Sequence, residues 1–152
     1  MAIVWTSDLD TGITVIDQQH RRIVDYINQM EGAQAKQDRT MVGKVLDELV
    51  DYTLSHFAFE ESLQEEAGYR FVKPHRKVHE LFVRRVNEYR DRFNAGENVA
   101  EETHKLLSAW LINHIKRDDA DYISSVKPQL DAITTDDRKE GWVARALGRF
   151  FR

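Results

Sequence analysis

The sequence predicts an all-α protein: an up-down-up-down four-helix bundle with an N-terminal arm and an extra C-terminal amphipathic helix. Four segments of similar length repeat apolar residues at the helical period, and short connections separate them. The chain has only two prolines and seven glycines, the residue types least favourable inside helices. Its 152 residues are enough for one domain with a sizeable core.

Residues 1 to 16 are expected to form an irregular arm, because apolar anchors alternate there with turn formers. Trp5 among these anchors indicates that the arm packs on the body of the protein. The first helix is expected from Asp17, a good N-cap residue, to about Gln34. His20 lies within its apolar stripe and is therefore expected to point at the core.

The second helix is expected from Asp38 or Thr40 to about Ala67. His56 and Glu60 interrupt an otherwise apolar inner face, four residues apart on the same side of the helix. The remaining members of that face are Met41, Val45, Leu49, Tyr52, Phe59 and Leu63. A turn over residues 68–73, beginning with a glycine, follows the helix.

The third helix is expected to begin at Pro74, since a proline in the first helical turn loses no hydrogen bond. Its inner stripe opens with His75 and His79, again four residues apart, and residues 94–96 close the helix.

The fourth helix is expected to follow a capping box formed by Asn98 and Glu101. Its stripe contains His114 and continues to Tyr122. The helix is expected to end before Pro128.

Composition excludes several functional classes. The net charge of −4 argues against a nucleic-acid binder. The chain has no cysteine, which removes disulfides, thiolate zinc sites and iron–sulfur clusters. No apolar run approaches the roughly 18 residues that a membrane span requires, and no secretory leader is visible. The expectation is a soluble, cytoplasmic protein.

Five of the six histidines fall on core-facing stripes, together with Glu60 and an aspartate at 118 or 119. Burying so many polar groups is costly unless they are paired or bind a metal. The set exceeds what one tetrahedral zinc can use and suits two metals that share carboxylates. Imidazole and carboxylate without sulfur suit iron, manganese, zinc or copper. The histidines are His20, His56, His75, His79 and His114, whereas His104 lies outside the stripe and is expected at the surface.

These motifs together resemble those of bacterial hemerythrins, O2-binding four-helix bundles with two irons. The resemblance spans about residues 3 to 130 and rests on a joint pattern that is highly specific. The matching pieces are Trp5, Gly12–Ile13, Ile16–His20, His56–Glu60, Gly68–Tyr69, His75–His79 and Trp110–Asp119.

The resemblance implies two non-haem iron ions with an oxo or hydroxo bridge. His75, His79 and His114 would hold one iron, and His20 and His56 the other. Glu60 and the aspartate of the fourth helix would bridge both ions. The two-histidine iron would be one ligand short, and O2 would bind there.

The choice of aspartate sets helical geometry against the resemblance. Asp118, four residues after His114, lies about 40° around a regular helix, whereas Asp119 lies about 140° around. The family spacing selects Asp119, which requires a locally adjusted helix such as a π-bulge. We predict Asp119.

Four apolar residues, Ile23, Phe57, Trp110 and Leu111, resemble the family's O2 pocket by position. The alternative is that each is an ordinary core residue. Tyr122 could donate a hydrogen bond to a residue of the metal site, but packing is the expected role.

The C-terminal segment 134–152 is expected to be separate from a bundle formed by residues 1–133. Its polar start, residues 134–140, can cap a helix. Residues 141–152 place apolar residues on one helical face and three arginines on the other, with no acid. Such a helix can lie on an anionic membrane surface, dock on a protein partner, or pack on the bundle or in a dimer contact.

Reversible O2 binding, for storage, delivery or sensing, is the leading functional prediction, in a non-enzyme that is a monomer or weak oligomer. A di-iron peroxidase or oxidase is the alternative from another class. Such enzymes carry more glutamates in Glu-x-x-His pairs, and the predicted core has none. A signalling module that responds to O2, NO or iron is a third class.

Overall fold

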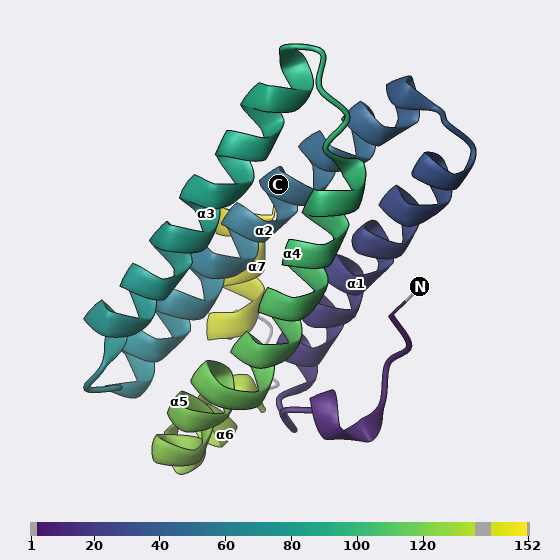
Figure 1. The fold of residues 1–152 in the computed structure, drawn as a ribbon. Helices are drawn as coiled ribbons and strands as arrows, with labels where there is room; N and C mark the ends of the chain where they lie inside the picture. The colour runs from purple at the N-terminus through teal and green to yellow at the C-terminus, as the bar shows by residue number, and fades with distance from the viewer. Residues whose placement is uncertain (1–2, 136–140, 152) are drawn as a thin grey trace.

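The structure is a computed structural model that describes residues 3–135 and 141–151. Four long antiparallel helices form the predicted bundle (Figure 1). The elements are the short 3-10 turn η1 (Ser7–Leu9), α1 (Thr14–Ala35), α2 (Arg39–Ala67), α3 (Val72–Asn94), α4 (Ala100–Asn113), the π-helical segment η2 (His114–Asp119), α5 (Ala120–Ser125), α6 (Lys127–Thr134) and α7 (Trp142–Phe150). In the described part of the chain, no helix is long and apolar enough to cross a membrane.

The N-terminal arm lies along the bundle, as predicted. The backbone N–H of Ile3 donates to Asn28 Oδ1 (2.8 Å), and Asn28 Nδ2 donates to the carbonyl of Ile3 (2.9 Å). The half-buried Trp5 packs against the core and donates from its ring nitrogen to Asp10 (2.7 Å). These contacts hold the arm on α1.

Helix α1 begins at Thr14, three residues before the predicted N-cap. Asp17 instead accepts hydrogen bonds from the backbone N–H of Thr11 (2.8 Å) and of Gly12 (3.2 Å). The N-cap assignment was wrong because this carboxylate reaches back from the first turn and fixes the preceding loop.

Helix α2 matches its predicted bounds. The Asp38 side chain accepts from the backbone N–H of Met41 (3.0 Å), which satisfies one free donor of the first turn. Gly68 ends the helix in the left-handed region at φ +78°, where a side chain would be strained. Met41, predicted to face inward, is 43% exposed because it lies in that first turn, beyond the core.

Helix α3 begins at Val72, so Pro74 lies in its first turn rather than at its start. The predicted capping box before α4 is absent. Val99 occupies the N-cap position, and its carbonyl accepts from the backbone N–H (2.9 Å) and the hydroxyl (2.7 Å) of Thr103. The buried Thr103 thus donates to a carbonyl and caps no free N–H group of the first turn, so the role expected of Asn98 and Glu101 was wrong.

Helix α4 runs through η2 into α5 without leaving the bundle. The chain then turns at Val126 into α6, a short helix that was not predicted, with Pro128 in its first turn. Leu130 is fully buried and anchors α6 to the core.

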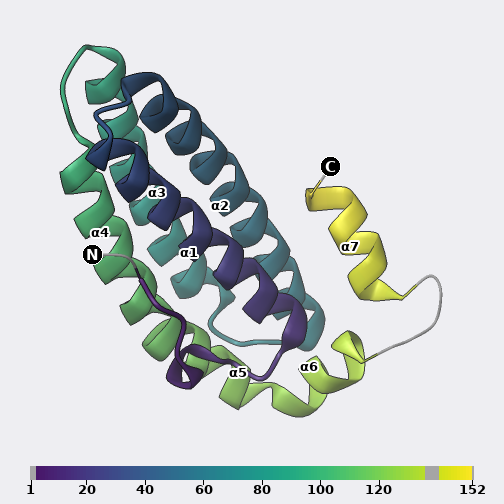
Figure 2. The same cartoon turned by 90° about the vertical axis from the view of Figure 1, so that its right-hand side faces the viewer.

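Helix α7 packs on the outside of the bundle against α2 and α6 (Figure 2). The rings of Trp142 and Phe151 lie 5.5 Å and 6.0 Å from that of Phe59, and Ala146 is buried. Of the alternatives for this segment, packing on the bundle is the one that the structure contains. The predicted capping stretch lies largely at residues 136–140, outside the described residues.

The apolar core is divided into two main clusters. Along α1, Ile16 belongs to one cluster and Ile23 to the other, with His20 between them. Along α2, Phe57 belongs to the same cluster as Ile23, and Phe59 belongs to the same cluster as Ile16. A polar layer therefore crosses the bundle between two apolar halves.

Replacing Asp38 with alanine is expected to lower the free energy of unfolding by about 1 kcal/mol, because the N–H of Met41 loses its acceptor. Urea unfolding followed by circular dichroism measures this. The matched control is Asp51→Ala, an exposed aspartate inside the same helix. Equal losses in the two variants would contradict the capping role.

Candidate metal centre

The polar layer is built from all four bundle helices. α1 supplies one histidine, α2 a histidine and a glutamate, α3 two histidines, and η2 a histidine and an aspartate. Each of these side chains is at least 95% buried. The residues are His20, His56, Glu60, His75, His79, His114 and Asp119.

Glu60 lies at the centre of the layer. Its Oε1 is 3.0 Å from Nε2 of His75 and 3.1 Å from Nε2 of His79. Its Oε2 is 3.6 Å from Nε2 of His56 and 4.0 Å from Nε2 of His20. One carboxylate thus presents an oxygen to each of two groups of imidazoles.

Asp119 has the same relation to the two groups. Its Oδ2 is 3.1 Å from Nε2 of His20. Its Oδ1 is 3.3 Å from Nε2 of His75 and 3.2 Å from Nε2 of His114. Two carboxylates therefore span the same pair of histidine groups.

The π-helical segment η2 brings Asp119 into the layer. In a regular α-helix this residue would lie about 140° around from His114. The wider π turn returns it to the same side, and the side chain is fully buried. Asp118 is 41% exposed in its side chain and accepts a hydrogen bond from His114 Nδ1 (2.9 Å). The expected local adjustment of this helix is present.

Outer partners orient two further imidazoles. His56 Nδ1 contacts Gln19 Oε1 (2.6 Å), and His79 Nδ1 contacts Glu61 Oε1 (3.2 Å). These contacts direct both Nε2 atoms toward the centre of the layer, the arrangement that metal-binding histidines need. Sequence reasoning missed Gln19 and Glu61. The one available signal was an amide next to His20 and a carboxylate next to Glu60 on the same helices.

Tyr122 donates a hydrogen bond from its hydroxyl to Glu60 Oε2 (3.2 Å) and is fully buried. Burial, followed by the nearby charges of Glu60 and Asp119, raises the pKa of Tyr122 well above its ordinary value. The phenol therefore keeps its proton and acts as a donor. Packing was the expected role of Tyr122, but the alternative, a hydrogen-bond donor to the metal site, is the one that the structure contains.

The imidazoles differ in their protonation. Burial lowers the pKa of His56 to about 3, so its ring is neutral at pH 7. Burial also disfavours the charged form of His75, but the nearby carboxylates of Asp119 (3.3 Å) and Glu60 (3.0 Å) outweigh it and raise the pKa of His75 to about 9. Without a metal, the carboxylates are thus balanced in part by protons on the imidazoles.

Several atoms of the layer lack a hydrogen-bond partner among the described residues. Both ring nitrogens of His20 and both carboxylate oxygens of Asp119 are buried without one. The 3.1 Å approach of these two side chains does not have hydrogen-bond geometry. Buried polar atoms of this kind need another partner, and a cation is the partner that a carboxylate and an imidazole share.

Donor atoms gather in two sets. One set joins Glu60 to the histidines of α3 and η2, and the other joins Glu60 to those of α1 and α2. Within each set, the donor atoms lie within 4.8 Å of one another. In the first set, Nε2 of His79 and Nε2 of His114 lie 3.0 Å apart and point at each other. The residues present therefore fit two metal ions that share a carboxylate.

The predicted pocket residues lie in one core cluster beside the layer. Phe57 stacks on His79 with ring centroids 3.8 Å apart, and Trp110 stacks on His114 at 4.3 Å. Ile23 and Leu111 are buried in that cluster. Their role toward O2 stays a prediction.

His104 is not the surface residue that was predicted. Its side chain is 12% exposed, and Nε2 lies 3.3 Å from Glu31 Oε2. Helix α1 packs against α4 and covers His104. The prediction failed because His104 precedes the apolar stripe from which burial was predicted.

Comparison with known proteins agrees with this site. The family model of the hemerythrin HHE cation-binding domain matches residues 11–125. A Pseudomonas aeruginosa protein named bacteriohemerythrin is 53% identical over 149 residues, which cover 98% of this chain and 97% of that protein. A bacteriohemerythrin of Methylococcus capsulatus is 33% identical, covering 79% of this chain and 93% of its own. A crystal structure of wild-type hemerythrin superposes with a TM-score of 0.76 at 31% identity, covering 80% of this chain and 95% of that one. The chain belongs to the hemerythrin family.

Proposed function

We propose that this protein binds O2 reversibly at a non-haem di-iron centre in the polar layer. The observation that carries the proposal is the presence of two buried donor sets that share Glu60. Membership of the hemerythrin family supports iron as the metal and O2 as the ligand. Imidazole and carboxylate donors without sulfur suit iron.

The two donor sets are unequal. His75, His79 and His114 would hold one iron, and His20 and His56 the other. Glu60 and Asp119 would bridge them, because each presents one oxygen to each set. The set with two histidines would give its iron fewer protein donors than the other set, which would leave room there for an incoming ligand.

Two ferrous ions in this layer would supply the electrons that dioxygen takes up on binding. The protein's own residues protect and orient the site. Phe57 and Trp110 stack on two of the imidazoles and keep water from that side. Tyr122 holds the orientation of Glu60 through its hydroxyl.

We propose a carrier rather than an enzyme. The polar layer consists of five imidazoles and two carboxylates, whereas di-iron carboxylate proteins of the Glu-x-x-His type use more glutamates. A ligand set with little negative charge favours binding of O2 over its activation.

The ferrous protein, purified without oxygen, is expected to contain two irons per chain and to gain a visible absorption band in air. Removal of O2 under argon should reverse the band, because the proposed ligands are buried away from water. Iron analysis and repeated spectra measure this. Irreversible bleaching with turnover of an added reductant would identify an enzyme instead, and one iron per chain would refute the di-iron centre.

Asp119→Ala and Asp118→Ala form a matched pair at adjacent positions. Asp119→Ala is expected to lose bound iron and the O2 band, because it removes one oxygen from each donor set. Asp118→Ala removes only the acceptor of His114 Nδ1 and is expected to weaken iron binding by about 10- to 100-fold. Iron retained per chain after dialysis against a graded chelator separates the two. The reverse order would show that Asp118 is the ligand.

We also propose that residues 1–133 form the O2-binding bundle and that residues 134–152 are an accessory segment that covers Phe59. The ring contacts of Trp142 and Phe151 support this. The same aromatic face would have to leave α2 before it could enter a membrane. Attachment to an anionic membrane surface would therefore compete with packing on the bundle.

Deletion of residues 134–152 is expected to leave the iron content and the O2 band unchanged and to cost about 2 kcal/mol of stability, since buried aromatic area is lost. Thermal unfolding measures the cost. Co-sedimentation with anionic vesicles, with neutral vesicles as control, tests whether residues 134–152 can also attach the protein to a membrane. Equal sedimentation of the full and shortened chains would refute attachment through this segment.

A further inference from the structure

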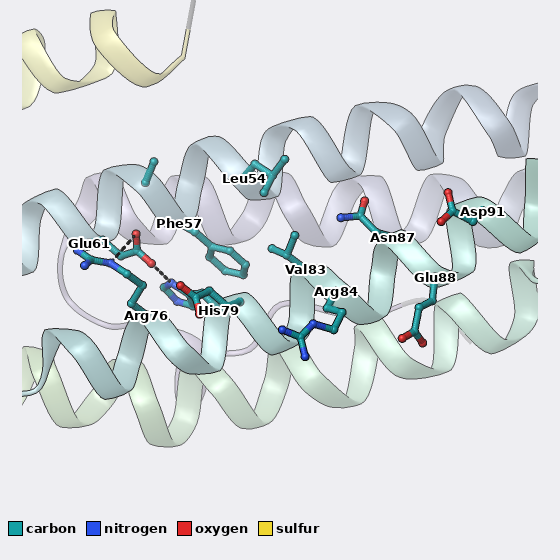
Figure 3. A pocket seen from close by; sticks show the side chains of 12 residues that line it. Leu54, Phe57, Glu61, Arg76, His79, Val83, Arg84, Asn87, Glu88 and Asp91 are labelled. Carbon is teal, nitrogen blue, oxygen red and sulfur yellow. Dashed lines mark hydrogen bonds and ion pairs between the residues drawn. The ribbon is translucent and has the colours of Figure 1, made fainter.

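Two imidazoles of the three-histidine set have carboxylates behind them. His79 Nδ1 lies 3.2 Å from Glu61 Oε1, and His114 Nδ1 lies 2.9 Å from Asp118 Oδ2. Figure 3 shows Glu61 between His79 and Arg76, beside a groove of about 620 Å³ along α2 and α3. Both carboxylates reach solvent, since 18% of the Glu61 side chain and 41% of the Asp118 side chain are exposed.

The two-histidine set has a neutral partner instead. His56 Nδ1 lies 2.6 Å from Oε1 of Gln19, and Gln19 is only 3% exposed. The other imidazole of this set, His20, has no hydrogen-bond partner on Nδ1 among the described residues. In the described part of the chain, the outer nitrogens of this set are therefore backed by an amide and by no carboxylate.

The amide of Gln19 selects one tautomer of His56. Its oxygen accepts the hydrogen bond, so the proton of the neutral ring lies on Nδ1 and the lone pair lies on Nε2. Nε2 is the nitrogen that faces the polar layer, 3.6 Å from Glu60 Oε2. The opposite orientation of the amide would place the proton on Nε2, where it would block a metal ion.

A carboxylate and an amide act differently on a metal-bound imidazole. A hydrogen bond from Nδ1 to a carboxylate raises the basicity of the ring, because the negative charge draws the proton away from it. Such a ring gives more electron density to a metal ion and stabilises its oxidised state. A neutral amide orients the ring but lacks this charge. The difference counts for more in a buried layer, where charges are poorly screened.

We infer that Gln19 is a positioning residue that orients His56 and keeps it a weaker electron donor than the imidazoles of the three-histidine set. The two sides of the metal centre are thereby unequal in donor strength as well as in the number of histidines. The weaker donation falls on the side with room for an incoming ligand, where it favours the release of bound O2. This last consequence rests on the proposed function, whereas the tautomer and the difference in donor strength do not.

Exchange of amide and carboxylate tests the difference in donor strength. Gln19→Glu is expected to lower the midpoint potential of the iron-loaded, full-length protein by about 59 mV, a tenfold change in the ratio of oxidised to reduced centre. Glu61→Gln makes the opposite exchange behind His79 and is expected to raise the potential. The matched control is Gln18→Glu, the same change at an exposed neighbouring position, with a native potential. Redox titration measures all three variants.

The rate of O2 release tests the consequence for the carrier. Stopped-flow measurement is expected to show O2 dissociation slowed about tenfold in Gln19→Glu and unchanged in Gln18→Glu. Native O2 dissociation in Gln19→Glu, together with a lowered potential, would overturn the role in O2 release.

The tautomer is tested without iron. Histidine 15N NMR of the metal-free, full-length protein is expected to show the proton of His56 on Nδ1. Gln19→Met keeps the length of the side chain but removes the acceptor, so the proton is expected to move toward Nε2, where Glu60 is the remaining acceptor. The same His56 signal in both proteins would overturn the positioning role.

The outcomes separate this inference from the proposed function. Native potentials in both Gln19→Glu and Glu61→Gln, with two irons per chain, would overturn the difference in donor strength. An equal shift in Gln18→Glu would also overturn it, because any added charge would then suffice. Glu61→Gln buries no new charge and carries this test alone if Gln19→Glu fails to bind iron. Shifted potentials in a protein that never binds O2 would overturn the proposed function and uphold the role of Gln19.

Discussion

The arrangement of the four helices depends on two buried carboxylates. Glu60 and Asp119 are fully buried among five imidazoles, and each presents one oxygen to each of two histidine groups. Charge buried in this way is costly unless it is compensated locally. Every helix of the bundle must therefore bring a nitrogen donor to the same level. The division of the apolar core into two clusters follows from that layer.

The helix that carries His114 and Asp119 departs from regular α-helical geometry between these two residues. His114 and Asp119 can both face inward only because η2 widens into a π-helix. The chain resumes an α-helix at Ala120, and Tyr122 then reaches Glu60. The π-helical turn is thus confined to the six residues that carry two of the proposed ligands, and such turns are frequent at functional sites.

Much of this could be predicted from the sequence because periodicity reports which side of a helix is buried. The bundle, the bounds of α2, the five histidines and Glu60 follow from such patterns, whereas Asp119 was selected by the family resemblance against regular helical geometry. Capping was less predictable, since the contacts of Asp17 depend on the path of the loop and no side chain caps the start of α4. The partners of the imidazoles were missed for a similar reason: Gln19 and Glu61 are common helix residues whose contacts appear only when neighbouring helices pack. Ligand roles and the O2 pocket stay predictions.

Helix α2 has a special position in this arrangement. It packs against α1, α3, α6 and α7 and also carries the carboxylate at the centre of the layer. Apolar packing is non-directional and would tolerate a small slide of one helix past another. Glu60 would not, because a slide of one residue moves its oxygens by about 1.5 Å along the axis. The relative heights of the helices are therefore set by the donor atoms of a few polar residues, and the far larger apolar surface adapts to them.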